Sequence, residues 1–192
     1  MDIVLPFLLA FGFVILFELG DKTQLMTISF ASRYSKKMVF LGSWLGLGLV
    51  TVIGVVIGVL LGAAFDDFWI KIIAAVIFIA FGVWTLVRRK EEEVKKDIPD
   101  KKVFSQTFLF VVLAELGDKT QIMVIWLTAN YGAPLSVLLG ALLGFAVVVA
   151  IGVLIGKEIG KRVDTKWIVL VSGILFIVIG IIVAIEAFFP FG

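Results

Sequence analysis

Long runs of apolar residues, separated by short charged segments, dominate the chain. Runs of about 18 or more apolar residues are long enough to cross a bilayer as helices. The pattern predicts six spans, with boundaries soft by several residues: 3–32, 38–64, 68–87, 103–130, 134–156 and 167–188. All 4 prolines lie near span ends or between spans, where a missing N–H is tolerated. We therefore expect an all-α polytopic membrane protein.

Composition supports this class. Of the 192 residues, 61% are hydrophobic, whereas a soluble domain has about 45–50%. The chain has no Cys and no His, which excludes disulfides and removes the thiolate and imidazole ligands of typical zinc and copper sites. The first apolar run is too long for a signal-peptide core, so we expect it to be a retained span.

One charged heptapeptide interrupts the apolar pattern twice. Residues 18–24 read Glu-Leu-Gly-Asp-Lys-Thr-Gln, and residues 115–121 repeat this sequence without a change. An unpaired charge inside hydrocarbon costs from about 3 to roughly 10 kcal/mol or more. Such a cost, carried twice in one pattern, is hard to explain by packing. We expect the two copies to form one functional site, and the Gly-Asp pair in each to kink or break its long span.

The likeness between the two halves extends beyond the heptapeptide. With the register shifted by one residue after the first loop, Gly42, Gly46, Gly54, Gly58 and Gly62 match Gly140, Gly144, Gly152, Gly156 and Gly160. The chain therefore divides into an N-terminal repeat (1–87), a charged linker (88–102) and a C-terminal repeat (103–192). The linker is either a solvated hinge or a cation-sensing segment. Each repeat has an odd number of expected spans, so the second enters the membrane from the opposite side, as an inverted-topology repeat.

Basic residues predict the orientation of these spans. When loops alternate between the two sides, all Lys and Arg fall on one side except Lys71 and the motif lysines Lys22 and Lys119. Because cytoplasmic loops carry the excess of basic residues, we expect these loops in the cytoplasm and both termini outside. Both heptapeptides then lie at mid-depth, where the pseudo-two-fold axis brings them together.

The chemistry of the heptapeptide suits a hard metal ion. In a continuous helix the acidic residues and the lysine of each copy share one face, with the glutamine beside it. Facing copies offer the oxygens of Glu18, Asp21, Gln24, Glu115, Asp118 and Gln121. Such ligands favour Ca²⁺, Mn²⁺ or Mg²⁺. Four carboxylates and two lysines sum to a charge of −2, which one divalent cation or two protons neutralise. This balance predicts an exchanger with one metal ion moving against two protons, and no resident cofactor.

For several side chains the sequence leaves two alternative roles. Lys22 and Lys119 either neutralise an acidic neighbour or occupy the empty site as surrogate cations. Thr23 and Thr120, which a continuous helix places on the opposite face, either bond the backbone at a break or bind the ion. Met26 and Met123 either pack or offer a thioether that favours Mn²⁺. Glu186 is expected near the outer membrane interface.

At this point the residues resemble a family. Two copies of Glu-x-Gly-Asp-Lys-Thr, in the first and fourth of six spans, resemble the signature of the Gdt-type cation/proton exchangers, which include Golgi and thylakoid calcium/manganese transporters and bacterial manganese exporters. The resemblance implies export of Mn²⁺ and/or Ca²⁺ from the cytosol, against protons or sodium. Its acidic residues carry over as Glu18, Asp21, Glu115 and Asp118. The absence of an N-terminal targeting extension leads us to expect a prokaryotic plasma-membrane protein.

Three other functions compete with an exchanger. A passive cation channel can use a ring of carboxylates. An intramembrane aspartyl protease uses two aspartates that share a proton, but here the two contexts are identical and a lysine stands beside each aspartate. A membrane scaffold has no need of buried charge. The expected partners are thus a divalent cation, protons or Na⁺, and the lipid bilayer, without nucleic acid; the oligomeric state, including a homo-oligomer, stays open.

Overall fold

The computed structural model describes residues 3–87, 102–159 and 165–189. Within these ranges the chain is helical and has no strand, which confirms the predicted all-α class. The helices are α1 (Val4–Glu18), α2 (Lys22–Arg33), α3 (Lys36–Ala64), α4 (Asp67–Val87), α5 (Val103–Glu115), α6 (Lys119–Tyr131), α7 (Pro134–Ile159) and α8 (Thr165–Phe188). The predicted linker, 88–102, lies outside the described residues except for Lys102.

Three helices can each cross a bilayer by length and composition: α3, α4 as far as Trp84, and α7 as far as Leu154. A fourth span arises if α1 and α2 count as one segment, bent by 68°. Two further helical segments, Val103–Glu115 and Gly173–Phe188, are apolar but shorter. The described residues thus contain three to four of the six predicted spans, and the six-span arrangement stays a prediction.

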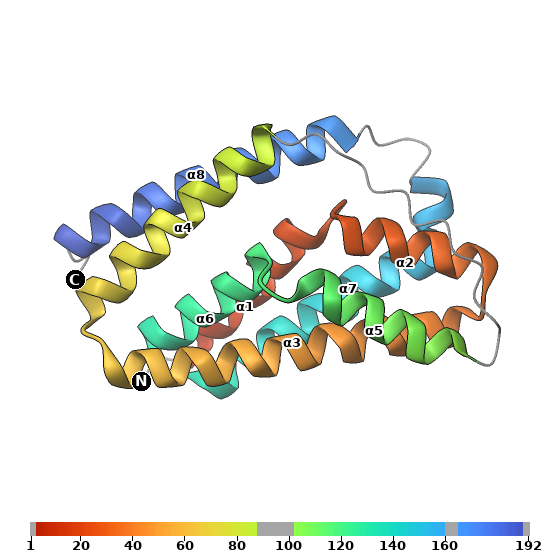
Figure 1. Cartoon of the computed structure of the whole chain (residues 1–192), viewed down its shortest axis with the longest axis horizontal. Helices are drawn as coiled ribbons and strands as arrows, with labels where there is room; N and C mark the ends of the chain where they lie inside the picture. Colours follow the sequence, from red (N-terminus) through yellow and green to blue (C-terminus); the bar gives the residue numbers. More distant parts are fainter. Residues whose placement is uncertain (1–2, 88–101, 160–164, 190–192) are drawn as a thin grey trace.

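The second predicted span of each half, α3 or α7, packs against the interrupted first span of the other half. Helix α3 lies along α5 and α6, and α7 lies along α1 and α2 (Figure 1). Glycine permits this close approach. A Cβ atom at Gly42 of α3 would lie 2.8 Å from the Phe104 carbonyl oxygen, and one at Gly140 of α7 would lie 2.3 Å from the Phe7 carbonyl oxygen. The glycine ladders therefore interlock the two halves.

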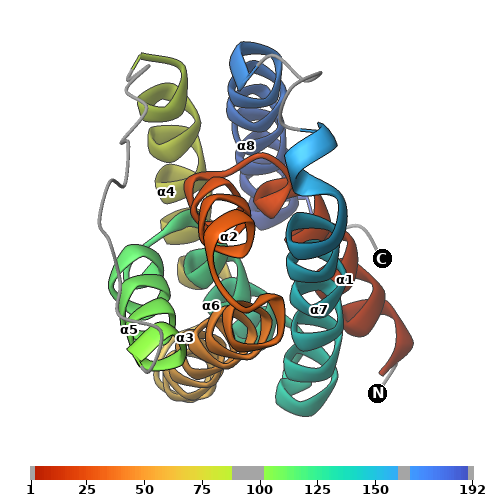
Figure 2. The ribbon, with the colours of Figure 1, turned by 90° about the vertical axis from the view of Figure 1, so that its right-hand side faces the viewer.

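The third predicted spans of the two halves, α4 and α8, pair with each other beside this interlocked core (Figures 1 and 2). Their contact also depends on glycine, since a Cβ at Gly82 would lie 2.7 Å from the Gly173 carbonyl oxygen. Aromatic rings join the pair to the core. Phe176 of α8 stacks on Phe17 of α1 with ring centroids 3.9 Å apart, and Phe78 of α4 meets Trp126 of α6 edge to face at 5.8 Å.

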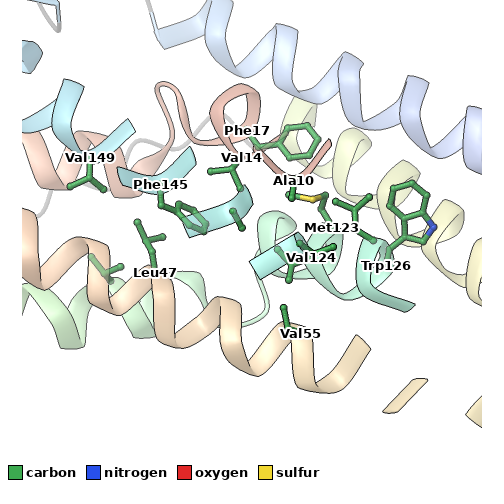
Figure 3. Packing of buried hydrophobic residues seen from close by; sticks show 14 of the residues in the cluster. Ala10, Val14, Phe17, Leu47, Val55, Met123, Val124, Trp126, Phe145 and Val149 are labelled. Carbon is green, nitrogen blue, oxygen red and sulfur yellow. The ribbon is translucent and has the colours of Figure 1, made fainter. Parts of the chain in front are cut away.

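Apolar side chains from α1, α3, α6 and α7 fill the centre of the molecule (Figure 3). Many large apolar side chains also cover the outside, including Leu60, Val76 and Leu113, each 62% exposed. An aqueous surface rarely carries so much apolar area, whereas a lipid-facing surface requires it. The chain is accordingly an integral membrane protein.

Candidate ion-binding site

Each heptapeptide ends one helix and begins the next. Helix α1 ends at Glu18 and α2 begins at Lys22, and α5 and α6 are interrupted in the same way. Gly20 and Gly117 have φ angles of 84° and 78°, in the left-handed region that glycine adopts without a steric penalty. The two breaks therefore follow the same backbone path, set by the repeated sequence.

The break changes which side chains face the site. A continuous helix would place Thr23 opposite Glu18, Asp21 and Lys22, and this expectation is wrong because the helix stops at Glu18. Instead the Thr23 hydroxyl donates a hydrogen bond to Glu115 Oε1 of the other copy. In return the Thr120 hydroxyl donates to Glu18 Oε1 at 2.6 Å. The threonines thus bond to carboxylates across the interface, a role that neither of their two interpretations included.

Three carboxylates converge where the two breaks meet. Single carboxylate oxygens of Glu18, Asp21 and Glu115 all lie within 4.8 Å of one another. The two glutamates are almost fully buried, at 1% and 2% exposure. The geometry therefore brings together three of the four predicted acidic ligands, two from the first copy and one from the second. The fourth, Asp118, lies outside this triangle.

The lysines also pair across the interface. Lys119 Nζ lies 2.8 Å from Asp21 Oδ2, and Lys22 Nζ lies 3.4 Å from Asp118 Oδ1. Both aspartates occupy the N-cap position of the helix that follows, yet neither side chain makes a capping hydrogen bond. Their carboxylates are therefore directed to the lysines and the site rather than to the helix ends.

The glutamines have a local role. The Gly20 N–H donates to Gln24 Oε1, and the Gly117 N–H donates to Gln121 Oε1 at 2.7 Å. A helix break frees backbone N–H groups that need acceptors, and these amide oxygens supply them. In this structure the two predicted amide ligands thus stabilise the breaks, and their role as ion ligands stays a prediction.

The helix ends bring partial charges of both signs to the site. The N-terminal ends of α2 and α6, which carry partial positive charge, begin directly after the aspartates. The ends of α1 and α5, with their partial negative charge, reach the site at Glu18 and Glu115. Interrupted helices that meet in this way offer carbonyl groups and carboxylates to a cation. All the acidic donors are hard oxygens, which fits a Ca²⁺, Mn²⁺ or Mg²⁺ ion.

Two other sequence expectations have clear positions. Met26 and Met123 are buried in the hydrophobic core, at 7% and 1% exposure (Met123 in Figure 3).

A separate charged cluster lies between α4 and α8. There Lys71 Nζ, with its side chain only 8% exposed, lies 2.7 Å from Asp67 Oδ2 and 3.1 Å from Glu186 Oε1. The i, i+4 spacing of Asp67 and Lys71 could have indicated the first pair, but nothing in the sequence links Lys71 to Glu186.

Comparison with known proteins identifies the family. The family model described as "Divalent cation/proton antiporter GDT1" matches residues 6–93 and 103–190. The chain belongs to the GDT1 family. It is therefore grouped with transporters rather than enzymes, which removes the protease alternative. No solved structure matches the chain.

Several curated proteins are similar to this GDT1 chain. PAM71, chloroplastic, of Arabidopsis thaliana is 33% identical over 96% of this chain and 58% of that protein. A Vibrio cholerae protein named as a manganese exporter is 34% identical over 66% of this chain and 64% of that protein. GDT1-like protein sll0615 of Synechocystis is 29% identical over 86% of this chain and 89% of that protein. The chain thus spans less than two thirds of the length of the first two relatives.

Proposed function

We propose that this GDT1 chain is a secondary active transporter that exports Mn²⁺ and/or Ca²⁺ from the cytosol in exchange for protons. The observation that carries the proposal is the triangle of Glu18, Asp21 and Glu115, in which oxygens from both heptapeptides lie within 4.8 Å. A single divalent cation can contact all three carboxylates at once. Similarity to a protein named as a manganese exporter supports Mn²⁺ as one substrate.

Charge balance supports exchange rather than one-way movement. The two heptapeptides contain four carboxylates and two lysines, for a total of −2 when all are ionised. One divalent cation cancels this charge, and so do two protons. A neutral loaded site can change its exposure within a membrane at low cost, whereas the empty, charged site pays a desolvation penalty. The expected stoichiometry is one metal ion for two protons.

We further propose six spans in two inverted repeats, 1–87 and 103–192, with each interrupted helix pair acting as one broken span. Two observations support this architecture. The family model matches the chain in two segments that correspond to the two repeats. The contacts at the site are reciprocal, with threonine to glutamate and lysine to aspartate in both directions. The bias of basic residues supports cytoplasmic loops and outer termini. Similarity to a Vibrio cholerae protein supports a prokaryotic plasma membrane.

Transport by the purified full chain in liposomes tests the proposal. Mn²⁺ and Ca²⁺ uptake is followed with a trapped metal indicator while a trapped pH dye reports protons, with either a pH gradient or a Na⁺ gradient imposed. We expect saturable metal flux that a pH gradient drives uphill, with opposite proton movement. A metal flux without proton movement would contradict proton exchange; linear, non-saturating flux would indicate a channel.

Matched variants connect the flux to the site. Glu115→Gln removes one corner of the triangle and should abolish metal-driven proton movement. Asp66→Asn is the control, because it removes an exposed carboxylate in the turn between α3 and α4, outside the site. Equal flux from the two variants would reject the triangle as the transport site.

A further inference from the structure

The two motif lysines have identical sequence contexts but different environments. The Lys119 side chain is 8% exposed and its ammonium lies 2.8 Å from Asp21. The Lys22 side chain is 49% exposed and its ammonium lies 3.4 Å from Asp118. The Lys119 ammonium is therefore buried and close to its aspartate, whereas the Lys22 side chain is half exposed and its ammonium lies further from its aspartate.

Helix packing accompanies this difference. Helix α4 packs against α6, which begins with Lys119. The matching contact from the C-terminal half to the N-terminal half would be between α8 and α2, which begins with Lys22. Among the described residues, α8 makes no comparable contact with α2. Helix α2 thus lacks a neighbour that α6 has, which accompanies the greater exposure of Lys22.

The partner carboxylates differ in their place in the site but little in burial, since the Asp21 side chain is 19% exposed and the Asp118 side chain 13%. Asp21, the partner of Lys119, belongs to the carboxylate triangle, whereas Asp118, the partner of Lys22, does not. Oδ2 of Asp21 and Oδ2 of Asp118 are both buried and make no hydrogen bond with any described residue. The Lys119 ammonium nevertheless lies 2.8 Å from Asp21 Oδ2, whereas the Lys22 ammonium lies beside the other oxygen of Asp118, Oδ1. A buried carboxylate oxygen without a donor is an unusual cost, and a cation in the triangle would compensate for it.

We infer that Lys22 is a detachable counter-cation: its ammonium leaves Asp118 when a divalent cation enters the triangle, Asp118 becomes the fourth carboxylate ligand, and Lys119 stays on Asp21. The inference rests on the proposed function and adds the order of events at the same site. The half-exposed Lys22 side chain has room to move a few ångströms while its ammonium stays at the edge of the site, near the other carboxylates. Separation of Lys119 from Asp21 would instead leave the buried Lys119 ammonium without its partner, which costs several kcal/mol.

Lysine labelling of the solubilised full chain tests the inference. Reductive methylation, read by mass spectrometry, reports the accessibility of each ammonium with and without saturating Mn²⁺. We expect Mn²⁺ to increase the modification of Lys22 several-fold and to leave Lys119 protected. Unchanged or decreased modification of Lys22, or exposure of Lys119, would overturn the inference.

Equilibrium Mn²⁺ titration of the same samples distinguishes a failure of this inference from a failure of the proposed function. If the chain binds Mn²⁺ but Lys22 does not respond, the inference is wrong while the transport proposal stands. If the chain binds neither Mn²⁺ nor Ca²⁺, the proposed function itself fails. A matched pair of variants adds an independent readout: Lys22→Gln should tighten Mn²⁺ binding several-fold with near-normal thermal stability, whereas Lys119→Gln should lower thermal stability. Equal effects of the two substitutions would also overturn the inference.

Discussion

The two copies of the heptapeptide have the same sequence and the same backbone path but not the same surroundings. Each copy ends a helix at a glutamate, turns at a left-handed glycine and starts a new helix at a lysine. The differences come from residues outside the heptapeptides. Helix α6 carries Trp126 against Phe78 of α4, whereas the equivalent position in α2 is Ser29. Within the described part of the chain, α8 makes no comparable contact with α2. The two identical heptapeptides are therefore surrounded by helices that pack differently around each copy.

The substitutions with the largest expected effect on Mn²⁺ affinity test whether the two lysine–aspartate pairs contribute equally to metal binding. Asp21→Asn with Lys119→Gln removes a corner of the triangle, and Asp118→Asn with Lys22→Gln removes the outer pair; both double variants keep the net charge of the site. We expect Mn²⁺ affinity to fall about 100-fold in the first and about tenfold in the second, by analogy with the loss of ligands and of their supporting groups. Titration calorimetry measures both. Equal losses would mean that the triangle does not define the site.

The sequence predicted much of this site because its signals are local or repeated. Charges within apolar runs identified Glu18, Asp21, Glu115 and Asp118 before any contact was known. The repeat likewise indicated that the two copies belong to one site, and the structure brings residues of both together. Helical class also followed from long apolar runs, which specify helices directly.

The remaining features depended on the break and on long-range packing. Helix periodicity placed Thr23 on the wrong face, because a three-residue interruption resets the angle between side chains before and after it. The same interruption frees the N–H groups that engage Gln24 and Gln121. The inequality of Lys22 and Lys119 had no local signal, since it arises from how α4 and α8 lie against the other helices.

The next effect compares the interlocking contacts of the two halves. Gly42 and Gly140 occupy matching positions, but an added Cβ would approach a backbone oxygen to 2.8 Å at Gly42 and 2.3 Å at Gly140. Because backbone cannot move aside as a flexible side chain does, Gly140→Ala should lower the free energy of unfolding by about 1–3 kcal/mol, and Gly42→Ala by less. Chemical unfolding in detergent measures both. Gly12→Ala is the control, as nothing lies within 4 Å of its added methyl group; equal stability of all three variants would contradict the interlocked packing.

A third pair of substitutions, read by metal affinity, tests the reciprocity of the threonine contacts. Thr23→Val and Thr120→Val each keep the side-chain volume and remove the hydroxyl that donates to a buried glutamate of the other copy. Loss of one such hydrogen bond to a charged group costs about 1.5–3 kcal/mol. Since these bonds orient the metal-binding carboxylates, Mn²⁺ affinity should fall by about tenfold in each variant. Thr51→Val is the control, because its hydroxyl bonds the Leu47 carbonyl within its own helix. A large loss in only one of the two motif variants would show that the asymmetry reaches the glutamates themselves.

The smallest effect concerns a polar contact that only the N-terminal half possesses. The hydroxyls of Thr27 in α2 and Ser43 in α3 lie 3.1 Å apart and are buried, whereas the matching positions in the other half are Val124 and Ala141. Hydrogen bonds between membrane helices contribute about 0.6 kcal/mol on average, so Thr27→Val alone should lower stability by about that amount and leave the Ser43 hydroxyl without its partner. Adding Ser43→Ala makes the contact equivalent to that of the C-terminal half and should recover most of the loss, because replacing both partners with apolar groups is nearly neutral. Thermal unfolding of the single and double variants measures this recovery. If the double variant is instead less stable than the single one, the hydroxyl pair stabilises the contact between α2 and α3 in a way that the apolar pair in the other half does not reproduce.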